Sequence, residues 1–220
     1  MKTILITGAS GFIAPHVIKA SLDKNLMVMG IDILDQNPGE KVVHKNYTFK
    51  KMDVRDLNLE IMKNVDYVLH LAFVTNIPNS IQNPVDTTKD NIDMTVFLLN
   101  LCVEAKVKKF LFPSTGSLYG NNPIPWNEDM MADPIEPYSF QKLSCEIACK
   151  TWTACYGLPT TVFRFFQVYG GETLRSAPGL TPAFLQVTIP HLYLYQCDVQ
   201  YQVYYFELNL NYCLYDVAKH

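Results

Sequence analysis

Six short apolar runs, separated by stretches with a helical pattern, constrain the fold of this chain more than any other feature. The runs read "KTILITG", "LMVMGID", "TFKKMDV", "VDYVLHLA", "KKFLFPST" and "PTTVFRFF". Helical patterns follow the first run to about Leu22 and occupy residues 88–105 and 138–155. Short strands that alternate with helices predict an α/β fold, in which helices cover both faces of a doubly wound parallel sheet.

A glycine-rich turn, "TGASGFIA", follows the first run and opens the first helix. Gly8 permits a tight turn, and Gly11 lets the backbone approach a pyrophosphate. The helix N-terminus offers free N–H groups and its positive dipole end to the phosphates. Ala14 stands where a third glycine is common, and its methyl group still allows close helix–strand packing. The turn predicts a Rossmann-like dinucleotide site, although an ordinary strand–helix turn can read the same way.

Two aspartates bear on the choice of cofactor. Asp32 ends the second run, where a carboxylate accepts hydrogen bonds from both hydroxyls of the adenosine ribose. A carboxylate there also repels a 2′-phosphate, so the pattern favours NAD over NADP. Asp53, in "MDVRD", has two interpretations of similar weight. It either contacts the adenine amino group or caps the next helical element.

A candidate reactive group follows in "EPYSFQK", where Tyr138 and Lys142 stand four residues apart on one helix face. A free tyrosine has a pKa near ~10, and a nearby ammonium is expected to lower that pKa. Thr115 ends the fifth run, and open parallel sheets bind ligands at the carboxyl ends of their strands. The three residues can hold and deprotonate a substrate hydroxyl. The alternatives are a polar helix surface for the Tyr–Lys pair and a turn or cap for Thr115.

Charge and cysteine content exclude several classes of function. The net charge is −3 with both signs interspersed, which argues against a nucleic-acid surface or a basic membrane-binding face. The opening "MKTILITG" has too short an apolar run for a signal peptide. The six cysteines form no CxxC pair, so we expect no metal site and a reduced, cytoplasmic protein.

The chain resembles the extended short-chain dehydrogenase/reductase family, specifically its NAD-dependent nucleotide-sugar epimerase/dehydratase group. The matching stretches are "TGASGFIA", Asp32, "DVRD", "HLAF", "NPVDTTKDNIDMT", "PSTGSLYG", "PYSFQK" and "RFFQVYG". The resemblance implies a catalytic set of Thr115, Tyr138 and Lys142. It implies that the dinucleotide is lined by Gly8, Ser10, Gly11, Phe12, Ile13, Asp32, Ile33, Asp53, Val54, Leu71, Ala72, Phe73, Tyr138, Lys142 and Phe166. It implies that the substrate contacts Thr75, Thr115, Tyr138 and Gln167.

The residues after Thr115 indicate which reaction of the group to expect. The 4,6-dehydratases of this family carry an Asp–Glu pair there, whereas this chain has Gly116 and Ser117. The resemblance therefore implies a 4-epimerase, in which Tyr138 takes the hydroxyl proton while C4 passes a hydride to NAD and later regains it on the other face. Gln167 replaces the usual asparagine of the family and keeps its donor and acceptor.

Two other functions compete with the epimerase. An NAD(P)-dependent carbonyl or keto-sugar reductase uses the same Thr/Tyr/Lys set, and Ala14 leans slightly toward it. A non-catalytic NAD-binding module is the third interpretation, which the short chain favours and the intact catalytic set opposes.

The domain organisation is expected to change after residue 170. Residues 1–170 would form the NAD-binding domain, and residues 171–220 the start of a substrate-binding region and the end of the sheet domain. Tyrosines crowd the last forty residues and the family pattern fades after about residue 182, so we expect a partial chain or an unreliable distal sequence.

Residues 92–105 and 139–155 are rich in apolar side chains. The family pairs such helices in a dimer interface, so the resemblance implies a homodimer.

Overall fold

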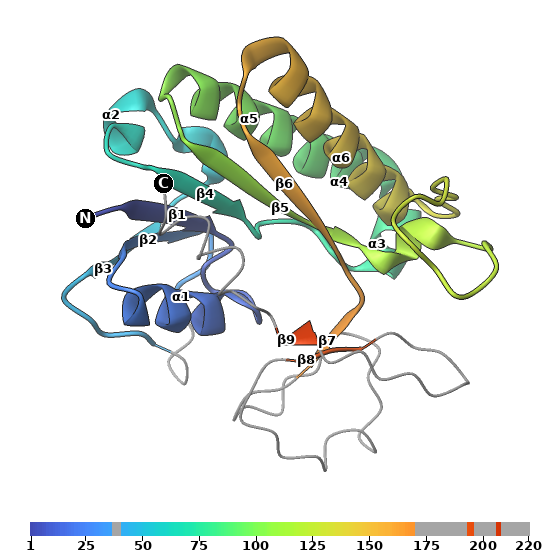
Figure 1. Ribbon diagram of the computed structural model, residues 1–220, viewed down its shortest axis with the longest axis horizontal. Coiled ribbons are helices and arrows are strands. Elements are labelled where there is room, and N and C mark those ends of the chain that lie inside the picture. Colours follow the sequence, from blue (N-terminus) through green and yellow to red (C-terminus); the bar gives the residue numbers. More distant parts are fainter. Residues whose placement is uncertain (37–40, 170–192, 196–205, 208–220) are drawn as a thin grey trace.

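A six-stranded parallel sheet forms the centre of the computed structural model, which describes residues 1–36, 41–169, 193–195 and 206–207 (Figure 1). The strand order is β3-β2-β1-β4-β5-β6. The order runs outward in both directions from β1 and β4, which creates the crevice where such sheets bind dinucleotides. The strands are β1 (Thr3–Thr7), β2 (Met27–Asp32), β3 (Tyr47–Lys51), β4 (Tyr67–His70), β5 (Lys109–Thr115) and β6 (Thr160–Phe165).

Helices cover both faces of this sheet, as the alternating pattern predicts. Helix α1 lies on one face, whereas α5 and α6 lie together on the other (Figure 1). Two apolar clusters fill the space between the helices and the sheet. One includes Ile6 of β1 and Ile18 of α1, and the other includes Leu98 of α5 and Phe110 of β5. The helices are α1 (Ala14–Asp23), α2 (Leu59–Met62), α3 (Ile77–Gln82), α4 (Pro84–Thr88), α5 (Met94–Glu104) and α6 (Pro137–Tyr156).

The helix predicted for residues 88–105 differs from the observed one in its first part. A π-helical turn, η3 (Lys89–Asp93), separates α4 from α5. Asn91 lies in this wide turn and is fully buried, although an asparagine in a regular surface helix is normally exposed. The turn thus brings a polar side chain between α6 and the loop that follows β4.

The chain leaves the parallel sheet at Phe166 and enters a second, three-stranded antiparallel sheet. Its strands are β7 (Gln167–Tyr169), β8 (Tyr193–Tyr195) and β9 (Phe206–Glu207), in that order. The rest of the region predicted as residues 171–220 lies outside the described residues, and so do the expectations made for it. Within the described part of the chain, no helix has both the length and the apolar character needed to cross a bilayer.

Candidate functional site

The glycine-rich turn lies at the crevice between β1 and β4. Gly8 has φ +68°, and a Cβ atom on it would stand 2.7 Å from the backbone nitrogen of Ala72. Only glycine therefore fits this position without strain. Gly11 donates its N–H to the carbonyl of Gly8 at 2.9 Å, which closes the turn beside the start of α1. The predicted lining residues Phe12 and Ile13 complete the turn and are partly exposed.

Helix α1 begins at this turn with Ala14, which is fully buried where the sequence pattern allowed a third glycine. Ile13 precedes the helix and provides no side-chain cap. Pro15 in the first turn has no N–H, and the N–H of Val17 donates to the Ile13 carbonyl at 3.4 Å. The helix therefore offers an anion the N–H of Ala14 and the positive end of its dipole. The bare backbone of the turn and the uncapped helix end fit the pyrophosphate of a dinucleotide.

Asp32 ends β2 beside this turn, as predicted. Its two carboxylate oxygens accept the backbone N–H groups of Ser10, at 3.0 Å, and Leu34, at 2.9 Å. These bonds fix the direction of the carboxylate, and each oxygen keeps a lone pair for a ribose hydroxyl. Ile33, the next predicted lining residue, is 62 % exposed. It can therefore cover an adenine ring only by contact at the surface.

Asp53 caps the short helix η2 (Val54–Asp56), which confirms one of its two interpretations. Its carboxylate accepts the backbone N–H of Arg55 at 2.8 Å and pairs with the guanidinium of the same residue at 2.8 Å. Hydrogen bonding to Arg55 lowers the pKa of Asp53. The carboxylate is therefore charged at neutral pH, and its contact with adenine remains a prediction. Val54, beside it, is buried.

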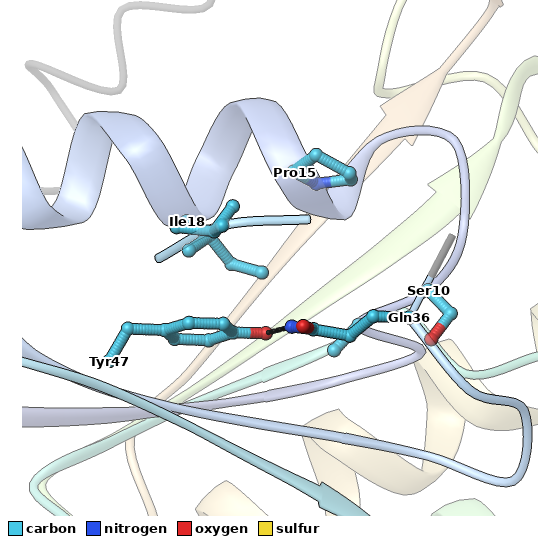
Figure 2. A pocket seen from close by; sticks show the side chains of 7 residues that line it. Ser10, Pro15, Ile18, Gln36 and Tyr47 are labelled. Carbon is cyan, nitrogen blue, oxygen red and sulfur yellow. Dashed lines mark hydrogen bonds between the residues drawn. The ribbon is translucent and has the colours of Figure 1, made fainter. Parts of the chain in front are cut away.

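A small cavity lies beneath α1, between this helix and β3 (Figure 2). The Gln36 amide donates to the Tyr47 hydroxyl at 2.8 Å across its floor. Burial raises the pKa of Tyr47, so its hydroxyl stays protonated. The cavity is lined by Ala9, Ser10, Pro15, Ile18, Gln36, Val42 and Tyr47.

The predicted catalytic residues come together at the carboxyl ends of β5 and β6. Thr115 is the last residue of β5, and Tyr138 and Lys142 project from the first two turns of α6. Glu136 caps α6 through the N–H groups of Tyr138, at 2.7 Å, and Ser139, at 3.0 Å. The Thr115 hydroxyl is close enough to the Tyr138 phenol to influence its pKa. The cap fixes the start of α6, and with it the turn from which the phenol projects.

The ionisation of Tyr138 differs from what the sequence suggested. Burial raises the pKa of Tyr138 to about 12, and the nearby Thr115 hydroxyl only partly opposes this effect. We expected the ammonium of Lys142 to lower that pKa. Instead the Lys142 Nζ lies 6.0 Å from the centroid of the Tyr138 ring and donates to the carbonyl oxygen of Pro113 at 2.7 Å. The lysine thus faces the strand, and the phenol stays protonated at neutral pH.

Lys142 itself is almost completely buried, with 4 % of its surface exposed. Its Nζ lies 3.7 Å from the centroid of the Phe73 ring and 4.7 Å from that of Phe112. Loss of water around the ammonium lowers the pKa of Lys142 to about 7. Aromatic faces and one carbonyl therefore replace the carboxylate that a buried ammonium usually requires.

The predicted Leu71–Thr75 loop follows β4 and supplies Phe73 to this group. The rings of Phe73 and Tyr138 meet edge to face, with centroids 6.0 Å apart. Leu71 and Ala72 pass directly under the glycine turn, whereas Thr75, predicted to contact substrate, is exposed. The loop therefore joins the dinucleotide end of the site to the Tyr138 end.

Phe166 closes the site on the β6 side. A Cβ atom on Gly116 would lie 2.5 Å from Cδ1 of the Phe166 ring, so this ring occupies the space of a side chain at position 116. The rings of Tyr119 and Trp126 stack on Phe166, with centroids 6.1 and 5.8 Å away. Gln167 begins β7 immediately after Phe166. Trp126 was not among the predicted site residues. It lies far from Phe166 in the sequence, and no sequence pattern indicates that their rings stack.

A buried polar network behind the Leu71–Thr75 loop was also missed. His70 Nδ1 lies 2.8 Å from the Thr7 hydroxyl, and its Nε2 lies 3.2 Å from that of Thr95. Thr95 donates its proton to the Asn91 carbonyl and Thr7 accepts the N–H of Ala72, so only the Nε2–H tautomer satisfies every group. Burial lowers the pKa of His70 to about 3, which keeps the ring neutral.

Both the sequence and the structure of this chain are similar to those of known proteins. The model of the NAD dependent epimerase/dehydratase family matches residues 4–188. One similar solved structure is a UDP-N-acetylglucosamine 4-epimerase from Methanobrevibacter ruminantium M1 in complex with UDP-N-acetylmuramic acid. It is 33 % identical in sequence, has a TM-score of 0.76, and the match covers 87 % of this chain and 65 % of the epimerase chain. Another is a UDP-glucuronic acid 4-epimerase from Bacillus cereus in complex with UDP-glucuronic acid and NAD. It is 30 % identical, has a TM-score of 0.73, and the match covers 81 % of this chain and 60 % of that epimerase chain.

The relatives also include an enzyme that catalyses a different reaction. The dTDP-D-glucose 4,6-dehydratase of Dictyostelium discoideum is 30 % identical over 195 residues, which are 77 % of this chain and 44 % of that protein. The chain spans about half the length of the curated relatives it matches, from 44 % to 57 % of the first six. The family match, the parallel sheet and the dinucleotide turn agree, and NAD is the family's cofactor. This chain belongs to the NAD dependent epimerase/dehydratase family.

Proposed function

We propose that this protein is an NAD-dependent nucleotide-sugar 4-epimerase with Thr115, Tyr138 and Lys142 as its catalytic set. Thr115 and Tyr138 hold the C4 hydroxyl of the sugar between their side-chain oxygens. Tyr138 removes and returns the hydroxyl proton, and Lys142 holds the nicotinamide ribose. NAD would supply the hydride acceptor and, through its positively charged ring, the charge that lowers the pKa of Tyr138.

The two residues after Thr115 are the observation that favours an epimerase over a dehydratase. A 4,6-dehydratase needs an acid and a base there to remove water from the sugar. The Phe166 ring lies where a side chain at Gly116 would stand, and the Ser117 hydroxyl is bonded to that of Thr115 at 3.0 Å. Neither residue supplies an ionisable group, so proton transfer at C4 is the chemistry that the side chains support.

Deuterium labelling separates the three candidate reactions. The purified protein would be incubated in D₂O with NAD and either UDP-glucose, UDP-glucuronic acid or UDP-N-acetylglucosamine, and the sugars analysed by NMR. A 4-epimerase yields the C4 epimer without solvent deuterium on carbon, because the hydrogen of C4 returns to the same carbon. A dehydratase incorporates deuterium at C5, because that carbon loses a proton and regains one from solvent. A reductase, supplied in a parallel reaction with NADH and a 4-keto sugar nucleotide, consumes NADH in stoichiometric amounts. Either of the last two results would refute the proposal.

A homodimer through α5 and α6 is part of the same proposal. The exposed large apolar side chains on these helices include Phe97, by 36 %, Phe140, by 49 %, and Ile147, by 57 %. Such side chains are suited to pair with a second copy of the chain. Ile147→Glu is expected to give a monomer in light scattering at a concentration at which the unmodified protein is a dimer. Leu59→Glu, an exposed apolar position on α2, is the matched control, and an unmodified protein that is itself monomeric contradicts the proposal.

A further inference from the structure

Gln141 lies between the two predicted catalytic residues of α6, and its side chain is completely buried. A buried amide must satisfy both its donor and its acceptor, or it destabilises the fold. The Oε1 atom of Gln141 accepts from Asn91 Nδ2 at 2.7 Å. Its Nε2 donates to the hydroxyls of Thr87 and Thr88, each at 3.0 Å. The amide therefore ties α6 to α4 and to the π-helical turn η3.

Asn91 extends this connection to the loop that carries Phe73. Its Oδ1 accepts the backbone N–H of Val74 at 2.7 Å, and its Nδ2 donates to the backbone carbonyl of Val74 at 3.1 Å. The Asn91 amide thus pairs with both polar groups of one loop residue, as a neighbouring strand would. The second Nδ2 hydrogen is the one given to Gln141.

The direction of every hydrogen bond in this series follows from the backbone of Val74. Its N–H can only donate and its carbonyl can only accept, which fixes how the Asn91 amide points. Asn91 then presents a donor to Gln141, so Gln141 must present its oxygen there and its NH₂ group to the threonines. The Thr87 hydroxyl donates to the Asn83 carbonyl at 2.9 Å, so it can only accept from Gln141. An amide is the side chain that satisfies both neighbours at once.

The consequence reaches the site through Phe73. Ala72 is held by the Thr7 hydroxyl at 3.0 Å and Val74 by Asn91, so both neighbours of Phe73 are fastened. The Phe73 ring in turn covers the ammonium of Lys142 at 3.7 Å. We propose that Gln141 is a positioning residue that holds the Leu71–Thr75 loop, and Phe73 within it, in register with Tyr138 and Lys142 on α6. The proposal rests on the proposed function in assigning the loop and Lys142 to the NAD site.

The test measures loop order and NAD affinity in Gln141→Leu, which keeps the approximate side-chain volume and removes both polar groups. Loss of one buried hydrogen-bond connection corresponds to about a ten-fold change in an equilibrium. We expect the Val74 amide to exchange with D₂O at least about ten-fold faster by NMR, and the NAD dissociation constant to rise by about ten-fold or more. The Ala72 amide, held by Thr7 instead, serves as the internal reference and is expected to change by less than about two-fold.

Two further proteins separate positioning from general destabilisation. Ser80→Ala removes a different buried hydroxyl, on α3 against α6, and is expected to leave Val74 exchange and NAD affinity unchanged. The double variant Thr87→Val, Thr88→Val keeps Gln141 but removes the acceptors of its NH₂ group. It is expected to shift both quantities in the same direction as Gln141→Leu, and it decides the matter if Gln141→Leu does not fold.

The outcomes are distinct from those of the epimerase assay. If the unmodified protein binds NAD but converts no sugar, the proposed function fails while the exchange and affinity measurements still decide the role of Gln141. A folded Gln141→Leu protein with unchanged Val74 exchange and unchanged NAD affinity overturns the positioning role. So does an equal gain in exchange at Val74 and Ala72, because a general loosening produces that result.

Discussion

Tyr138→Phe is expected to reduce sugar turnover by about 10²–10⁴-fold, the usual contribution of a positioned acid–base group. The substitution removes one oxygen, and with it the proposed proton-transfer group, whereas the Thr115 hydroxyl keeps its hydrogen bond with Ser117. The ring contact with Phe73 is retained, because Phe fills the same space. NAD affinity is therefore expected to stay within about three-fold of the unmodified protein, since the loss falls on the chemical step and not on binding.

The measurement is kcat for the substrate that the D₂O experiment identifies, with NAD binding followed by titration. Tyr156→Phe is the matched control, because Tyr156 ends the same helix and is 57 % exposed. Its turnover should equal that of the unmodified protein. A Tyr138→Phe protein that keeps more than about a tenth of its turnover would exclude Tyr138 as the proton-transfer group.

Lys142→Met is expected to remove a pH dependence of folding that the unmodified protein shows between pH 7 and about 9. Burial lowers the pKa of Lys142 from 10.5 to about 7, so at these pH values the unfolded chain carries a proton that the folded chain has lost. Stability consequently rises with pH through this window, by up to about 1.4 kcal/mol per pH unit. Methionine has a similar length and no charge, so this rise is absent from the variant.

The buried thiols oppose this effect at higher pH and limit the useful window. Burial raises the pKa values of Cys102, Cys145 and Cys149, so above about pH 9 these groups ionise only in the unfolded chain. Stability then falls with pH in both proteins. The difference between the two stability curves, from urea unfolding at each pH, therefore isolates the contribution of Lys142.

Lys150→Met provides the reference for this comparison, since Lys150 lies on the exposed side of α6. Its stability curve is expected to run parallel to that of the unmodified protein. A Lys142→Met curve that also runs parallel would show that the ammonium is not buried in solution. It would also contradict the arrangement in which the rings of Phe73 and Phe112 cover the Lys142 ammonium.

The sequence was sufficient to predict the parallel sheet because the inner strands β1, β4 and β5 are buried almost throughout and read as apolar runs. The edge strands β3 and β6 are less buried and were recognised from their place in the strand–helix alternation. All six runs became strands of the main sheet. Helices α2 and α3 were not predicted, since four and six residues are too few to display a helical period. The π-helical turn η3 was missed because a wide turn leaves no mark in composition.

The candidate site divides in the same way. Gly8, Asp32 and the Thr115–Tyr138 pair stand where local patterns and chain order placed them. The ionisation of Tyr138 did not follow from its spacing to Lys142, because the shift depends on how much water each group loses in the folded protein. The Asn91–Gln141 connection joins residues fifty positions apart, and no sequence period reports such a pair.

The contact between the glycine turn and the Leu71–Thr75 loop has a consequence for the life of the protein in a cell. Thr7 and Ala72, which join the two halves of the cofactor cradle, lie 65 positions apart, so the cradle exists only after β1 and β4 have paired. NAD can therefore bind the completed fold but not a partly folded chain. Each ten-fold excess of free NAD over its dissociation constant then adds about 1.4 kcal/mol to stability. A plentiful supply of the nucleotide is therefore expected to protect the folded chain from proteolysis.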